Sequence, residues 1–360
     1  MSDEKIVISK KDLSDPRVRE MVDQEKAARK PLSSQHREPV QTGIFFNPIF
    51  YTAAACSLGA FVAWLILEPM IIKKPGSEEG IGLSLLFPVT SAMVGLFAGL
   101  IEGIMSRNFQ KALKCGGIGL GVGLAWGAIA IIPANIIYIF LVSIGASIFP
   151  PPMKPGPDYF PKGGFLFMLM SARATAWTFI AAGMGLGQGI ALSSKKLILN
   201  GIAGGLLGGF LGGLIFDPIG LVMNLTMKDS GGGGSVSRMF GLIVVGMLVG
   251  VFLGLVENLT KEAWFIMKSG PLRGKQFVVF NNPLVIGSSP KCDVYIFKDA
   301  AVEPKHAELF QIGSKYELRD SKSAQGTFIN GKKVEKKILE NGDIIVIGES
   351  VLEFRQKAVG

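Results

Sequence analysis

Six long apolar stretches set the first constraint on how this chain can fold. A helix needs about 20 apolar residues to cross the hydrocarbon core of a bilayer, and each stretch is long enough. They are residues 44–72, 82–105, 115–147, 164–191, 197–225 and 237–258. A mean hydropathy of +0.41 agrees with membrane spans. The sequence therefore predicts a polytopic α-helical membrane domain over residues 44–260.

Basic residues in the short connections predict the orientation of these spans. Lysine and arginine concentrate on the cytoplasmic side of polytopic membrane proteins. Here they follow the second, fourth and sixth spans, at Arg107, Lys111, Lys114, Lys195, Lys196, Lys261, Lys268, Arg273 and Lys275. The pattern predicts a multi-pass protein of a bacterial inner membrane, in contact with lipid and with both termini in the cytoplasm.

The first 43 residues are predicted to form a disordered cytoplasmic tail. They contain nine Lys or Arg against eight Asp or Glu, with few large apolar residues. Such a segment buries too little surface to offset its ordering entropy. Because acidic residues match the basic ones, we expect no nucleic-acid partner. The tail also offers hydroxyl groups to a kinase, at Ser2, Ser9, Ser14, Ser33, Ser34 and Thr42.

Reactive residue types form no recognisable catalytic or metal-binding pattern in the sequence. The three cysteines, Cys56, Cys115 and Cys292, fit neither a metal site nor a disulfide framework. No Ser, His and Asp order and no phosphate-binding loop that opens a helix stands out. The sequence therefore predicts no enzyme, no cofactor and no metal.

Three segments of the apolar region resemble one another. They are GLIEGIMSRNFQKAL at 99–113, GLGQGIALSSKKL at 185–197 and GLVENLTKEAWF at 254–265. Each places Gly-Leu and then a polar residue ahead of basic residues, and the polar residues are Glu102, Gln188 and Glu257. Self-similarity of this kind is typical of internal duplication. The membrane domain is therefore predicted to contain helical hairpins related by a parallel repeat.

Glycines form two adjacent rows along the fifth span. The first row is Gly201, Gly205, Gly209 and Gly213, and the second is Gly204, Gly208 and Gly212. In lipid, such small-residue faces let two helix backbones approach closely. We expect packing within the chain, with an oligomer seam or a wall that admits substrate or lipid as alternatives. In the third span, Gly117, Gly119, Gly121 and Gly123 are spaced two apart, which predicts a loose or bent helix.

Three acidic residues of the spans are candidates for an ion pathway. Glu102 and Glu257 lie near the predicted cytoplasmic boundary, where a carboxylate reaches water or a basic neighbour, and this position argues against transport. Asp217 lies deeper in sequence terms and is the better relay candidate. The spans carry few other polar groups, so a channel or transporter is an alternative to the preferred function.

Beyond residue 270 the pattern changes to short alternating runs separated by turns. Runs such as FVVF, LVIG, DVYIF, KYELRD and IIVIG are typical of a β-sandwich. The order IGSSPKCDVYIF, VEPKHAELF, QGTFINGKKV and LENGDIIVIG resembles a forkhead-associated (FHA) domain over about residues 271–356. The resemblance implies an all-β sandwich that binds phosphothreonine peptides in the cytoplasm.

The resemblance also implies roles for individual residues. In the family, an Arg after the first motif glycine, a Ser in the next loop and an Asn before a Gly-Thr pair hold the phosphate. Ser288, Glu303 and Gln325 stand at these positions here. Since a carboxylate repels phosphate, the substitutions imply a rim for an unphosphorylated or basic peptide. The expected peptide-binding residues are Gly287, Ser288, Ser289, Lys291, Glu303, Lys305, Gln325, Gly326, Thr327 and Asn330, with His306 and Gly331 as structural residues of the module.

These patterns favour signalling or scaffolding over metabolism. We expect a membrane-anchored protein that recruits a cytoplasmic protein, phosphorylated or not, through the FHA-like module. The alternatives are a channel or transporter gated by that module and a homo-oligomeric membrane scaffold built on the glycine face.

Overall fold

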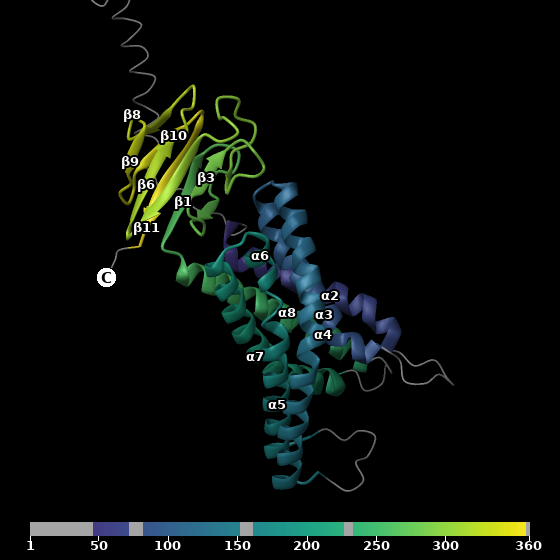
Figure 1. Cartoon of the computed structure of the whole chain (residues 1–360). Helices are drawn as coiled ribbons and strands as arrows, with labels where there is room; N and C mark the ends of the chain where they lie inside the picture. The colour runs from purple at the N-terminus through teal and green to yellow at the C-terminus, as the bar shows by residue number, and fades with distance from the viewer. Residues whose placement is uncertain (1–45, 72–81, 152–160, 227–232, 358–360) are drawn as a thin grey trace, which may run out of the picture. The chain divides into compact units, whose positions relative to one another are not determined.

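The protein divides into a helical unit and a β-sheet unit (Figure 1). The computed structural model describes residues 46–71, 82–151, 161–226 and 233–357. The helical unit comprises Thr42–Glu262 with Val279–Asn281, and the strands belong to the second unit. The predicted tail and its hydroxyl candidates lie outside the described residues.

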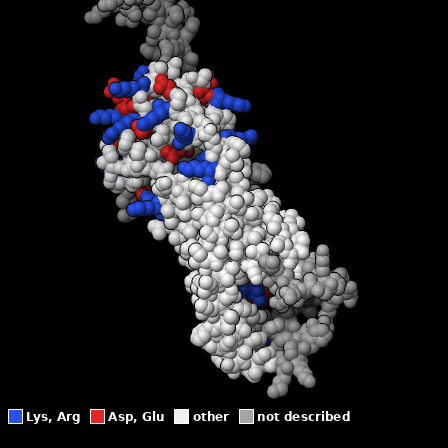
Figure 2. Space-filling model, turned by 45° about the vertical axis from the view of Figure 1, so that its right-hand side comes forward, with Lys and Arg blue, Asp and Glu red and all other residues white. Residues whose placement is uncertain are grey.

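Among the described residues, six helical segments are long and apolar enough to cross a membrane. This finding confirms the predicted helical fold class. Figure 2 shows few charged side chains on the surface of this unit. The helices are α2 (Pro48–Ile71), α3 (Gly82–Met105), α4 (Phe109–Ile148), α5 (Gly163–Ala181), α6 (Leu186–Ala191), α7 (Lys195–Thr226) and α8 (Gly233–Thr260).

Helix α4 begins six residues before the predicted third span and ends one residue after it. Its 40 residues extend about 60 Å at 1.5 Å per residue, against about 30 Å for the hydrocarbon core. The helix starts at Phe109 because Asn108 caps it, with the Asn108 side chain accepting a 2.9 Å hydrogen bond from Lys111 N. Pro133 lies within the helix and does not end it. An α4 that crosses a bilayer must therefore tilt or project beyond it.

The predicted fourth span is two helices, because a turn separates α5 from α6. Gly185 in this turn packs against the backbone of Gly201 in α7. Hydrogen bonds in the turn span three residues, as from Met184 N to Ala181 O at 3.0 Å. The tighter spacing interrupts the α-helix where the two backbones meet.

Two hairpins repeat each other's turn geometry. Helix α3 turns into α4 at Arg107, whose φ is 51°, and α6 turns into α7 at Ser193, whose φ is 53°. In each turn the carbonyl oxygen of the motif residue, Glu102 or Gln188, accepts a 3.0 Å hydrogen bond from the N–H four residues later. Gln188 follows Glu102 by 86 residues, as Ser193 follows Arg107. These matches support the predicted repeat.

The third motif belongs to a helix pair that makes the same contacts without a connecting turn. Three equivalent glycines each pack against the backbone of another helix: Gly99 on Cys115 of α4, Gly185 on Gly201 of α7, and Gly254 on Pro48 of α2. Helix α8 therefore pairs with α2 as α3 pairs with α4. Adjacent pairs touch through α2 and α3, α4 and α5, and α7 and α8. The six spans thus close into a ring of three similar pairs.

The two glycine rows of α7 contact two different helices of the same chain. The row from Gly201 to Gly213 lies on α5 and α6, and the row from Gly204 to Gly212 lies on α8. A Cβ on Gly209 would lie 2.6 Å from the carbonyl oxygen of Trp177. Both rows are covered within the chain, so a homo-oligomer would need another surface.

Glycines of α4 also form a packed stripe, which corrects the prediction of a loose helix. Gly119 and Gly123 lie against the backbone of α3, whereas Gly117 and Gly121 have no atom within 4 Å of an added Cβ. Alternate glycines therefore face different surroundings. Gly119, Gly123 and Gly127 form a row of glycines four residues apart. This row was not recognised in the sequence because Gly127 lies beyond the run of glycines that are spaced two apart.

Two ion pairs that contain a buried acid join helices in the described part of the apolar unit. Asp217, the predicted relay candidate, lies 2.9 Å from Arg173 Nε, which joins α7 to α5. Glu68 of α2 accepts two hydrogen bonds from Arg238 of α8. The side chains of Asp217 and Glu68 are only 9% and 7% exposed. Each acid therefore has a direct role in helix pairing.

The second unit is a sandwich of two sheets, which confirms the predicted all-β fold. The strand orders are β2-β1-β11-β10-β7-β8 and β4-β3-β5-β6-β9. Buried side chains such as Phe265, Ile286 and Phe354 fill the core. The strands are β1 (Ala263–Ser269), β2 (Gln276–Val278), β3 (Leu284–Gly287), β4 (Val294–Tyr295), β5 (Ala307–Ile312), β6 (Lys315–Asp320), β7 (Thr327–Ile329), β8 (Lys332–Val334), β9 (Lys336–Ile338), β10 (Ile344–Ile347) and β11 (Ser350–Gln356).

The sandwich begins earlier than the expected boundary at residue 271. Strand β1 starts at Ala263 and lies between β11 and β2. Its sequence, AWFIMKS, reads as an apolar continuation of the last span, which hid the strand. Lys268, expected in a basic loop, is buried in β1 with its Nζ 2.9 Å from Glu353 Oε2. Residues 261 and 262 alone separate α8 from β1.

Candidate peptide-binding site

Three loops of the sandwich carry the predicted rim: residues 288–293, 296–306 and 321–326. The first two are joined through their backbones, because Ser288 N donates to Glu303 O at 2.9 Å and Ser289 N donates to Pro304 O at 3.3 Å. Gly287 permits this approach, since an added Cβ would lie 2.9 Å from Glu303 O. Gly287 therefore shapes the rim by its lack of a side chain.

The Glu303 carboxylate links the second loop to the third. Its Oε1 accepts a 2.8 Å hydrogen bond from Ala324 N, and the backbone N–H of Glu303 donates to His306 Nδ1 at 3.2 Å. Glu303 stands at the position of the family's serine. Its negatively charged carboxylate thus already accepts a hydrogen bond from a backbone N–H of the rim. An anionic ligand at this point would lose that donor and meet a carboxylate.

The other predicted rim residues are more exposed. Lys291, Lys305 and Gln325 are exposed, while Ser288 and Ser289 are half-buried. Lys305 Nζ lies 2.8 Å from Glu308 Oε1, so part of its charge is neutralised. The rim therefore combines one carboxylate, hydroxyl groups, an amide and lysines.

His306 and Gly331 occupy positions that fit the expected structural roles. His306 is fully buried. Its backbone N–H donates to Ile286 O and its carbonyl accepts from Ser321 N, both at 2.9 Å. Gly331 has a φ of 80° in the turn between β7 and β8, a conformation that favours glycine.

Three of the expected peptide-binding residues make hydrogen bonds inside the module. The Thr327 hydroxyl donates to Asp320 Oδ1 at 2.7 Å. Asn330 Nδ2 donates to Asp343 Oδ1 at 2.6 Å. Gly326 N donates to the Ser323 hydroxyl at 3.1 Å. These groups therefore support the loops of the module, although Asn330 is also exposed.

Two aspartates that were not predicted from the sequence organise these loops. Asp320 accepts from Ser323 N at 2.9 Å and from the Ser323 hydroxyl at 2.6 Å. Asp343 accepts from Asn330, from Lys337 Nζ at 3.1 Å and from Glu340 N at 3.0 Å. The available signal was an Asp followed three residues later by Ser, since Asp side chains often bind nearby backbone in turns.

The pKa of Asp320 lies below its ordinary value. Burial by itself raises the pKa, but the hydrogen bonds from Ser323 and Thr327, together with nearby His306, outweigh it. A carboxyl whose pKa falls on folding stabilises the fold above its unfolded pKa, about 3.9 for Asp. That stability is lost as the pH falls through the folded pKa.

Replacing Asp320 by asparagine is expected to destabilise the module at neutral pH by about 1–3 kcal/mol, since an amide N–H would face the Ser323 donors. The variant should also lose less stability than the parent when acidified below about pH 3.9. Urea unfolding of residues 261–357 across pH measures both effects. The control is Glu335→Gln, because Glu335 is exposed. Equal acid slopes in parent and Asp320→Asn would contradict the assignment.

The comparisons with known proteins concern this module. The family model described as FHA domain matches residues 284–348. The oxoglutarate dehydrogenase inhibitor of Corynebacterium jeikeium is 34% identical over 100 residues, which cover 28% of this chain and 69% of that protein. The glycogen accumulation regulator GarA of Mycolicibacterium smegmatis is 32% identical over 100 residues, with coverages of 28% and 63%. Eight curated relatives are spanned over 57–69% of their length.

Solved structures of FHA domains are also among the matches. A structure from a study of phosphothreonine-dependent FHA domain interactions is 23% identical with a TM-score of 0.25, covering 27% of this chain and 99% of that chain. The FHA-2 domain of the Mycobacterium tuberculosis ABC transporter Rv1747 is 26% identical with a TM-score of 0.20, with coverages of 23% and 80%. With the family model and the Corynebacterium relative, the chain belongs to the family of proteins that carry an FHA domain.

Proposed function

We propose that this protein is a membrane-anchored signalling scaffold that recruits a cytoplasmic protein through its FHA domain. An FHA domain is a protein-interaction module of signalling. Six apolar helices offer the anchor, and basic residues after alternate spans support a cytoplasmic module at an inner membrane. The proposed function is binding and contains no catalytic step.

The hydrogen bond from Ala324 N to Glu303 carries the more specific proposal, that the partner is bound without a phosphate requirement. This carboxylate already occupies a rim donor, and Ser288 and Gln325 replace the Arg and Asn that the family uses. A lysine does not supply the bidentate fork of an arginine. A peptide segment with a basic side chain suits Glu303 better than a phosphorylated one.

Restoring the family residues should create phosphate preference. We expect the full chain in nanodiscs to bind phosphothreonine and matching threonine peptides from a degenerate library about equally. The triple variant Ser288→Arg, Glu303→Ser, Gln325→Asn should favour the phosphorylated peptides by about tenfold or more, since each hydrogen bond to a charged group contributes about 1.5–3 kcal/mol. Fluorescence anisotropy measures both affinities.

The control for lost negative charge is Glu335→Ser, which removes an exposed carboxylate outside the rim loops. It should leave the ratio of affinities unchanged. A native protein that already prefers phosphothreonine peptides by tenfold would refute the phosphate-independent contact. The proposal that the domain recruits a protein would then remain, with a phosphothreonine segment as the ligand.

A further inference from the structure

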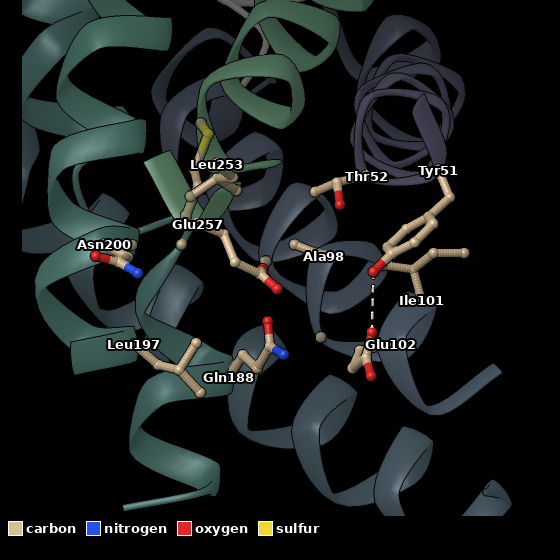
Figure 3. Close-up of a pocket in the computed structure, with 15 residues that line it drawn as sticks. Tyr51, Thr52, Ala98, Ile101, Glu102, Gln188, Leu197, Asn200, Leu253 and Glu257 are labelled. Carbon is tan, nitrogen blue, oxygen red and sulfur yellow. Dashed lines mark hydrogen bonds between the residues drawn. The ribbon is translucent and has the colours of Figure 1, made fainter. Parts of the chain in front are cut away.

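The three motif residues meet at one cavity of the helical unit. Glu102, Gln188 and Glu257 belong to three different helix pairs, yet all line the same pocket. Figure 3 shows Gln188 and Glu257 facing each other across it, with Glu102 at its side. Equivalent packing contacts of Gly99, Gly185 and Gly254 place each of them at the end of its pair. The internal repeat therefore brings its three motif residues to one cavity, and this cavity contains no residue of the peptide-binding site.

The cavity presents oxygen atoms from several helices. The Glu102 carboxylate accepts hydrogen bonds from the Tyr51 and Ser106 hydroxyls, both at 3.1 Å, and lies 3.7 Å from Lys111 Nζ. Among the described residues that line the pocket, two carry carboxylates and none is Lys, Arg or His. The lining thus favours a positively charged occupant. Its residues are Tyr51, Thr52, Gly95, Ala98, Gly99, Ile101, Glu102, Met184, Gly185, Gln188, Leu197, Asn200, Gly201, Leu253 and Glu257.

Thr52 supplies an independent sign of a ligand. It is 8% exposed, lines the pocket, and directs its hydroxyl toward the interior in Figure 3. This hydroxyl makes no hydrogen bond with a described residue, and the same holds for the Gln188 amide. Thr52 is buried and Gln188 is half-buried. Both groups have an oxygen to offer to an occupant of the cavity.

The size of the cavity limits what it can hold. Its volume is about 30 Å³ for the centres of water-sized spheres, and one such sphere requires roughly 10–15 Å³. The space thus accepts an ion with a water molecule but no organic substrate. Carboxylate, amide and hydroxyl oxygens are hard ligands, the type that alkali and alkaline-earth cations prefer.

We propose that this cavity binds a small hard metal cation through oxygens of Glu102, Gln188, Glu257 and Thr52. The cation links three helix pairs that are otherwise joined by apolar and glycine contacts and by hydrogen bonds such as that from Tyr51 to Glu102. Binding therefore stabilises the closed ring of spans. The Glu, Gln, Glu pattern at equivalent positions sets the negative charge of the site.

The test uses the full chain in detergent, purified in choline buffer at constant ionic strength. Sodium, potassium, magnesium or calcium chloride replaces choline in separate series, and tryptophan fluorescence reports Tm. We expect a saturable rise in Tm with at least one cation, because a ligand that binds only the folded state stabilises it. Glu257→Gln and Thr52→Val should weaken the apparent affinity by about tenfold or more, as ligand charge and number set cation affinity.

Gln188→Glu provides a second test that does not remove a ligand. A third carboxylate should raise the affinity for calcium or magnesium relative to sodium or potassium, and this remains measurable if Glu257→Gln fails to fold. Glu262→Gln is the control, because Glu262 is exposed and paired with Lys196 at 2.8 Å outside the cavity. A Tm that responds to no cation beyond choline, or that responds equally in all variants, overturns the proposal.

Discussion

Gly209→Leu is expected to prevent α5 and α7 from packing at their present distance. A Cβ at this position would lie 2.6 Å from the carbonyl oxygen of Trp177, which is backbone and cannot rotate away. Overpacking in a well-packed core costs about 1–3 kcal/mol and sometimes more, and we expect at least 3 kcal/mol here. For a domain of this size that corresponds to a Tm lower by roughly 6–12 °C.

The matched control is Gly121→Leu in α4, where an added Cβ meets no atom within 4 Å. The same side chain there should leave Tm almost unchanged, since it enters open space or lipid. Fluorescence-detected size-exclusion chromatography after heating gives both values. If both substitutions lower Tm equally, contact with the backbone of α5 does not explain the loss, because Leu has the higher helix propensity of the two residues, and the close-packed face is refuted.

Arg238→Met is expected to destabilise the contact between α2 and α8 by about 3–5 kcal/mol, the cost of leaving one member of a buried ion pair unpaired. Glu68 would keep its charge at 7% exposure without the two hydrogen bonds that it accepts from Arg238. The double variant Glu68→Gln with Arg238→Met should recover much of this loss, because no charge remains buried. A double-mutant cycle on Tm separates the two contributions.

Lys196→Met is the corresponding control at an exposed pair. Lys196 and Glu262 have side chains that are 45% and 53% exposed, and exposed pairs contribute only about 0–1 kcal/mol. Equal losses at both pairs would show that burial does not govern the effect. No recovery in the double variant would show that Arg238 acts through its packing instead of its charge.

Local patterns in the sequence determined the main elements of this protein. Runs of about 20 apolar residues specified long apolar helices, because a helix satisfies its backbone hydrogen bonds within one segment. Alternation and turn spacing beyond residue 270 specified the sandwich, and the glycine residues of α7 marked a close helix contact. The sequence also identified Glu102, Gln188 and Glu257 as equivalent residues of a repeat, but it did not predict that they lie at one cavity.

Contacts between distant segments could be decided only by the tertiary structure. The apolar run AWFIMKS became β1 because β11 supplies hydrogen-bond partners about 90 residues later. Glu303 became a loop bridge because the fold brings Ala324 N to its carboxylate. Asp217 became half of an ion pair because α5 places Arg173 beside it. Pairing α8 with α2 completed the third repeat and brought the three motif residues to one cavity, since sequence order cannot state which helices close a ring.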